Sequence, residues 1–183
     1  VSSAIKADNH ELIEARKRRI PIVKRAEMLA ELMRFKKTIA VAGTHGKTTT
    51  TSLMATILEK AQYDPTVING GIINSYNSNA KLGFSDWMVV EADESDGSFV
   101  HIAPTYSVVT NIDREHMDFY NSIDDLKKLF IKFINKVPSF GKSFICIDDK
   151  TNNTLVKKLK SQNFYTYGLN SNSNFWIKNI RQN

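Results

Sequence analysis

Cysteine is almost absent from this sequence: Cys146 is the single one among 183 residues, so no disulfide can form within the chain. Cys146 lies in a short apolar pattern, which indicates a buried and unreactive thiol. No stretch comes near the roughly 20 apolar residues that a membrane-spanning helix needs. The sequence therefore predicts neither a disulfide framework nor a membrane association, and it suits a reducing compartment such as the cytoplasm.

Motifs of two common enzyme classes are missing as well. The sequence has no Cys/His pairing of the kind that binds zinc and no Gly-x-Ser-x-Gly element of a serine hydrolase. Residues 1–4 have neither the basic start nor the apolar run of a signal peptide, and no initiator Met precedes them. We therefore expect a piece of a longer protein.

Aromatic residues are scarce in the one strongly basic region, where Phe35 is the single Phe, Tyr or Trp. Residues 1–37 contain ten Lys and Arg against five Asp and Glu, so they carry +5 of the net charge of +6. A nucleic-acid patch is one interpretation of the basic run from Arg16 to Arg19. The solvated end of a helix is the other, because basic side chains favour helix C-termini and no aromatic rings interleave the run. We expect no nucleic-acid partner.

Residues 43–51, Gly-Thr-His-Gly-Lys-Thr-Thr-Thr-Thr, are the most informative segment. Backbone N–H groups at a helix start bind anions, Lys47 can reach terminal phosphates, and the Thr48 hydroxyl can ligate Mg²⁺. The general phosphate-loop pattern has an earlier glycine where this chain has Val41, and an ordinary strand-to-helix turn is the alternative. The predicted phosphate-binding residues are Gly43, Thr44, His45, Gly46, Lys47, Thr48 and Thr49.

Strand patterns alternate with helical patterns along most of the chain, which predicts an α/β fold with a largely parallel sheet flanked by helices. Ligands of such sheets bind beyond the carboxyl ends of the strands. Three strands end on chemistry-bearing residues: the phosphate loop, Glu91 and Asn111. The expected strands are 20–23, 38–42, 67–73, 87–90, 106–110, 143–147 and 164–167, and the expected helices are 9–15, 26–33, 50–61, 123–137 and 151–161.

Two polar clusters follow buried strand patterns. Residues 91–96 contain four carboxylates, and Glu91 stands where a strand-end Mg²⁺ ligand belongs; a solvated acidic turn is the alternative. In residues 110–118, His116 could ligate a metal, and Asp113 or Asp118 could orient it or bind substrate. A surface histidine without function is the alternative for His116.

Together these clusters resemble the Mur ligase family, the ATP-dependent amide-forming enzymes of peptidoglycan precursor synthesis. The family's shortened phosphate loop, Gly-Thr-x-Gly-Lys-Thr/Ser, stands at residues 43–48 and accounts for the missing early glycine. The resemblance runs from residue 1 to about residue 150 and fades toward 183. The other stretches that carry it are residues 2–9, 25–33, 69–71, 91–96 and 111–118.

The resemblance implies a fold of three domains, of which this chain holds two in part. Residues 1–35 resemble the end of the N-terminal domain for the UDP-sugar with its linker, and residues 36–183 resemble an incomplete central ATP-binding domain. The resemblance also implies that the family's C-terminal domain is absent from this chain. The implied reaction joins L-alanine to UDP-N-acetylmuramate with ATP and Mg²⁺ through an acyl phosphate, in the cytoplasm. The chain by itself is not expected to ligate.

The resemblance also implies residue roles. Lys47, Glu91 and His116 would be catalytic, and Thr48, Glu91 and His116 would hold metal. No role follows for the His45 side chain. The residues that would face the muramyl substrate are Asn69, Gly70, Gly71 and Asn111.

Other functions remain open from the sequence. A recycling ligase that attaches a ready-made peptide shares the loop, but in that family an aromatic residue stands where this chain has Ser95. A folate-type glutamate ligase, a slow P-loop switch and a catalytically dead scaffold are further alternatives. No guanine-reading motif supports the switch, and the presence of Lys47, Thr48, Glu91 and His116 argues against the scaffold.

Overall fold

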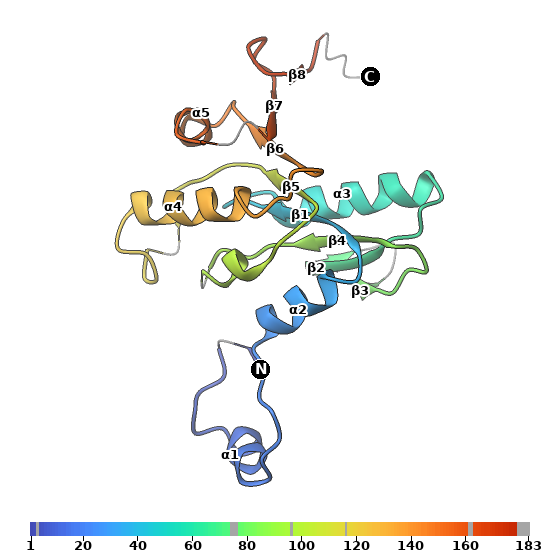
Figure 1. Ribbon diagram of the computed structural model, residues 1–183, viewed down its shortest axis with the longest axis vertical. Coiled ribbons are helices and arrows are strands. Elements are labelled where there is room, and N and C mark those ends of the chain that lie inside the picture. Colours follow the sequence, from blue (N-terminus) through green and yellow to red (C-terminus); the bar gives the residue numbers. More distant parts are fainter. Residues whose placement is uncertain (3, 74–76, 96, 116, 161–162, 179–183) are drawn as a thin grey trace.

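The computed structural model describes residues 1–183 except Ser3, residues 74–76, Asp96, His116 and residues 161–162 and 179–183. Within that part of the chain eight strands form one sheet in the order β3-β2-β4-β1-β5-β6-β7-β8 (Figure 1). All neighbouring strands run parallel except β2 and β3, which are antiparallel. The strands are β1 Lys37–Ala42, β2 Thr66–Ile73, β3 Ser78–Lys81, β4 Trp87–Glu91, β5 Tyr106–Val109, β6 Lys142–Cys146, β7 Phe164–Gly168 and β8 Phe175–Trp176.

The central strand β1 is buried on both faces. Side chains alternate along a strand, so Ile39 and Val41 point to one side of the sheet while Ala40 and Ala42 point to the other. Ile39 and Val41 pack with residues of α3, and the two alanines belong to the larger core that α4 covers. This double burial explains why the strand reads as one continuous apolar run. The helices are α1 His10–Lys17, α2 Arg25–Met33, α3 Lys47–Lys60, the short 3₁₀ helix η1 Ser98–His101, α4 Ile123–Ile134 and α5 Lys150–Val156.

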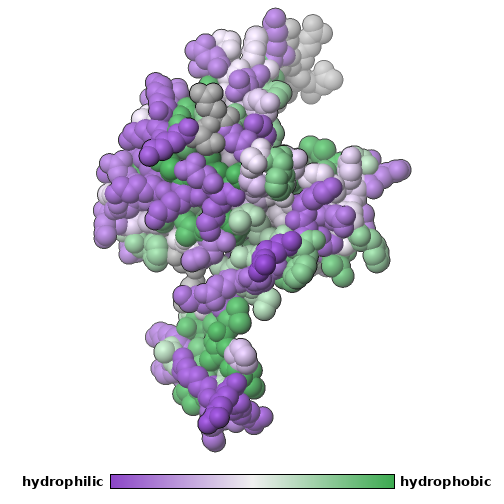
Figure 2. Space-filling model, viewed as in Figure 1, coloured by the Kyte–Doolittle hydropathy of each residue, from purple (hydrophilic) through white to green (hydrophobic). Residues whose placement is uncertain are grey.

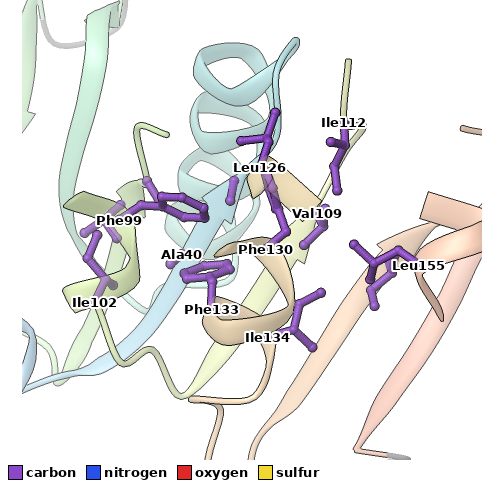
Figure 3. Packing of buried hydrophobic residues seen from close by; sticks show 14 of the residues in the cluster. Ala40, Phe99, Ile102, Val109, Ile112, Leu126, Phe130, Phe133, Ile134 and Leu155 are labelled. Atoms are coloured by element: carbon purple, nitrogen blue, oxygen red, sulfur yellow. The ribbon is translucent and has the colours of Figure 1, made fainter. Parts of the chain in front are cut away.

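Helix α4 contributes Leu126, Phe130, Phe133 and Ile134 to the larger core (Figure 3). The ring of Phe99, from η1, lies 5.0 Å from that of Phe130 and 5.4 Å from that of Phe133, measured between centroids. All three side chains are fully buried. Ser122 begins the helix by accepting a hydrogen bond from the N–H of Asp125. The amphipathic pattern predicted for this helix is confirmed.

Helix α1 lies apart from the sheet (Figure 1). Helix α1, which begins at Asn9 as its cap, contains no buried residue. Figure 1 shows α1 at the far end of the molecule, joined to the sheet through α2, and Figure 2 shows apolar side chains exposed there. Among the described residues, no helix is both long and apolar enough to cross a membrane.

The predicted α/β class is confirmed, and so are most of the expected elements. The strand expected at 20–23 is wrong: this segment pairs with no strand, Ile20 is 54% exposed, and Pro21 has no N–H to donate. The helix expected at 151–161 is shorter, ending at Val156. β3 and β8, which are short and largely exposed, are not among the strands predicted from the sequence.

Truncating a core ring should cost far more stability than truncating an exposed one. Phe130→Ala should lower the free energy of unfolding by about 3–5 kcal/mol, because it opens a cavity between α4 and η1. Phe140→Ala is the matched control, since Phe140 is 77% exposed, and it should change the value by no more than about 0.5 kcal/mol. Urea denaturation measures both. Equal losses would contradict the packing described here.

Candidate functional site

The phosphate loop joins the carboxyl end of β1 to the start of α3. Gly46 is the N-cap of α3, in the left-handed conformation with φ of 78°, and no side chain caps the helix. The first N–H groups of α3 therefore lack a side-chain acceptor, and the helix dipole places partial positive charge on them. This is the geometry that binds an anion at a helix start.

Hydrogen bonds clamp the loop to the residues that follow β5. The Thr44 N–H donates to the carbonyl of Asn111 at 2.9 Å, and the Asp113 N–H donates to the Thr44 hydroxyl at 2.9 Å. The Asn111 side chain holds His45 from both sides: its Oδ1 accepts from the His45 N–H at 2.8 Å, and its Nδ2 donates to the His45 carbonyl at 3.0 Å. Thr110 Oγ1 donates to the same carbonyl at 2.8 Å. The conformation of the phosphate loop thus depends on Thr110, Asn111 and Asp113, which follow β5.

The close approach of the loop to these residues requires glycine at position 43. Gly43 has φ of 140°, and a Cβ there would lie 2.0 Å from Thr110 Oγ1 and 3.0 Å from the Asn111 carbonyl oxygen. Any side chain would push the loop away from the end of β5. Gly46, in contrast, has no atom within 4 Å of a notional Cβ.

Lys47 makes a buried ion pair. Its Nζ lies 3.0 Å from Oε1 and 2.9 Å from Oε2 of Glu94, and it donates to the Thr44 carbonyl at 3.1 Å. The Lys47 side chain is 12% exposed and that of Glu94 only 1%. Burial raises the pKa of the Glu94 carboxyl, and Lys47 opposes that rise. This contact was not predicted, because no local signal in the sequence distinguishes Glu94 from the other three carboxylates of residues 91–96.

The predicted metal ligands Thr48 and Glu91 lie together. The Thr48 hydroxyl donates to Glu91 Oε1 at 3.2 Å, and the N–H of Gly70 donates to Glu91 Oε2 at 2.8 Å. The Asn69 side chain donates to the Thr48 carbonyl at 3.4 Å. A hydroxyl and a carboxylate beside a phosphate-binding helix start are oxygen donors of the kind that Mg²⁺ takes, so these residues fit the ion.

The remaining predicted residues are placed as follows. Gly71 lies against Thr48, since a Cβ there would be 3.0 Å from the Thr48 methyl group. Thr49 is exposed in the first turn of α3. The His45 side chain is 53% exposed, with Nε2 3.8 Å from Asp113 Oδ2 and 3.7 Å from Glu115 Oε1. His116 and Asp96 lie outside the described residues, and the described ones contain no group of three His, Cys, Asp or Glu suited to a metal.

A cavity of about 480 Å³ opens beside Glu91. Its polar wall comes from Asn69 and Gly70 of β2 and from Glu91 and Asp93 at the carboxyl end of β4. Its apolar wall comes from residues that precede α2 and from α2 itself. Residues of that second wall include Val1, Val23, Met28, Leu29 and Leu32. The cavity thus brings the predicted substrate residues Asn69 and Gly70 to the same place as the predicted metal ligand.

A glycine-rich loop at a helix start, a lysine and an oxygen donor pair, all at the carboxyl edge of a parallel sheet, define a P-loop α/β protein. Comparison with known families is more specific. The Mur ligase middle domain matches residues 41–183, and the Mur ligase family catalytic domain matches residues 1–37. The chain therefore belongs to the Mur ligase family.

Individual relatives support the same family assignment. A UDP-N-acetylmuramate–L-alanine ligase of Pelagibacter ubique is 66% identical over 182 residues, covering 100% of this chain and 39% of the relative. One of Parvibaculum lavamentivorans is 56% identical, covering 99% of this chain and 37% of the relative. The crystal structure of the UDP-N-acetylmuramate–alanine ligase of Thermotoga maritima is 32% identical with a TM-score of 0.77, covering 91% of this chain and 37% of that one. The chain thus spans less than two fifths of the length of these relatives.

Replacing Gly43 should damage the loop more than replacing Gly46. Gly43→Ala should lower the free energy of unfolding by about 2–4 kcal/mol, from backbone strain and the clash with Thr110. Gly46→Ala, strained by its left-handed conformation alone, should lower it by about 1–2 kcal/mol. Urea denaturation of the two variants compares the values directly. A loss at position 43 no larger than that at 46 would show that the loop does not press on the end of β5.

Proposed function

We propose that this chain is part of an ATP-dependent ligase that joins L-alanine to UDP-N-acetylmuramate in peptidoglycan precursor synthesis, in the cytoplasm. The observation that carries the proposal is the convergence of Lys47, Thr48 and Glu91 at the start of α3, beside the cavity that Asn69 and Gly70 line. The names of the relatives at 66% and 56% identity give the substrates. Cell wall construction, and with it cell shape and division, would depend on this product.

The residues suit activation of a carboxylate by phosphorylation. A carboxylate is a poor acyl donor, and transfer of the γ-phosphoryl group of ATP to it provides a good leaving group for attack by an amine. Two anions must meet for this transfer, so the site needs concentrated positive charge. Lys47 and the N-terminus of α3 supply part of that charge from the chain itself.

Thr48 and Glu91 are the residues that would hold Mg²⁺ between the phosphates. The ion, when bound, would neutralise charge on the phosphoryl oxygens during transfer. The Gly70 N–H donates to Glu91 Oε2 at 2.8 Å. This hydrogen bond would hold the Glu91 carboxylate in the orientation needed for binding the ion. His116 is proposed as a ligand of a second metal position near the γ-phosphate.

The cavity beside Glu91 is the proposed place of the muramyl group and its lactyl carboxylate. Asn69, Gly70 and Gly71 lie between that space and the phosphate loop and are proposed to face the substrate. Asn111 is also proposed to face it, although both polar atoms of its amide already hold His45. In this proposal residues 1–35 belong to the N-terminal UDP-sugar domain and its linker, and residues 36–183 belong to the central ATP-binding domain.

The proposed reaction is tested by ADP release in the full-length protein that carries this chain. ADP formation should require both UDP-N-acetylmuramate and L-alanine. Lys47→Ala should abolish it while the fold is kept, because the lost stabilisation of γ-phosphoryl charge is on the order of several kcal/mol. Lys60→Ala, at the exposed end of the same helix, is the matched control and should retain activity. Near-normal turnover of the Lys47→Ala variant would show that this lysine of the phosphate loop takes no part in the reaction.

The proposed metal ligands predict a separate effect. Glu91→Ala and His116→Ala should each raise the Mg²⁺ concentration needed for half-maximal activity, because each removes a proposed ligand. Asp96→Ala should have a smaller effect, since Asp96 is proposed to contact the ligands of the ion or to face the substrate rather than to bind the ion itself. Mg²⁺ titrations of ADP formation measure all three. Unchanged requirements in both ligand variants would take these residues out of the metal site.

A further inference from the structure

The carboxylate of Glu94 holds the lysine of the phosphate loop. An ammonium group has three N–H donors. The Thr44 carbonyl, at 3.1 Å, and Glu94 Oε1, at 3.0 Å, accept two of them. At most one donor therefore remains for a phosphate oxygen unless Glu94 releases the ammonium.

The position of Glu94 is itself fixed by its backbone. Its carbonyl accepts a hydrogen bond from the buried Tyr120 hydroxyl and another from the Gly97 N–H, at 3.0 Å. Glu94 is fully buried, so its side chain has little freedom to leave the lysine for water. The Glu94 carboxylate is therefore a buried hydrogen-bond acceptor that the fold places against Lys47.

This contact should affect nucleotide affinity and turnover in opposite directions. The Glu94 carboxylate offsets part of the charge that Lys47 offers to a polyphosphate, which weakens binding. It also confines a long and flexible side chain to one geometry, which favours a reaction that needs the ammonium at a defined point. The two effects act on different measurable quantities, namely nucleotide affinity and turnover.

We propose that Glu94 is a positioning residue: it holds Lys47 for phosphoryl transfer at the expense of affinity for the nucleotide. The inference rests on the proposed function, in which Lys47 contacts the phosphates of ATP. When nucleotide binds, the Lys47 ammonium donates hydrogen bonds both to Glu94 and to a phosphate oxygen. The bond to Glu94 keeps the ammonium from moving with the phosphate to another position.

The test uses the full-length protein and three variants. Glu94→Gln keeps the size of the side chain and removes its charge; Glu94→Asp keeps the charge and shortens the reach. Glu59→Gln is the matched control, because Glu59 pairs with Lys81 at 2.5 Å and away from the loop. Calorimetry gives the Kd for ADP and for tripolyphosphate, and ADP formation gives kcat.

Glu94→Gln should bind ADP and tripolyphosphate about 3–10-fold more tightly, while kcat falls about 10–100-fold because Lys47 is no longer held in place. Glu94→Asp should lose turnover with no gain in affinity, since the negative charge remains. Glu59→Gln should change neither quantity by more than about twofold.

Weaker polyphosphate binding in Glu94→Gln together with lower kcat would mean that Glu94 only supports the fold, and unchanged values would mean that it does not act on Lys47; either result overturns the inference. A wild-type protein that forms no ADP with the two substrates contradicts the proposed function instead. In that case tighter tripolyphosphate binding by Glu94→Gln still supports the contact inferred here, and its absence overturns it.

Discussion

The hydrogen bonds between the phosphate loop and the end of β5 are the constraint on which the site depends. A glycine-rich loop has many conformations in isolation, and fixing each residue costs about 1–2 kcal/mol of backbone entropy. Here the amide of Asn111 holds the His45 N–H and carbonyl at once, and the Asn111 carbonyl holds Thr44. These hydrogen bonds therefore fix the conformation of the loop.

The parallel sheet brings the other functional groups to the same edge. β2, β4 and β1 are adjacent, so Asn69, Glu91 and the loop emerge side by side although more than twenty residues separate each from the next. β1, in the middle of this arrangement, is buried on both faces, between α3 and the core that α4 covers. A contact such as Thr48 with Glu91, at 3.2 Å, follows from strand order rather than from any local motif.

The sequence predicted the loop, Glu91 and most strands because each has a local signal: glycines between a strand period and a helix period, or a carboxylate directly after an apolar run. It failed at 20–23, where an apolar run around Pro21 found no strand to pair with. It could not find the partner of Lys47 either, because Glu94 is one of several nearby carboxylates. Only the folded chain shows which of them is buried against the lysine.

The central claim is that this chain recognises phosphate groups through the clamped loop, with Mg²⁺ at Thr48 and Glu91. The direct test is calorimetric titration of residues 1–183 with ATP, GTP and tripolyphosphate in the presence of Mg²⁺. The account predicts weak binding of all three with Kd values within about threefold of one another, a spread of less than 1 kcal/mol. A strong preference for ATP over GTP, or binding of ATP without tripolyphosphate, would contradict it.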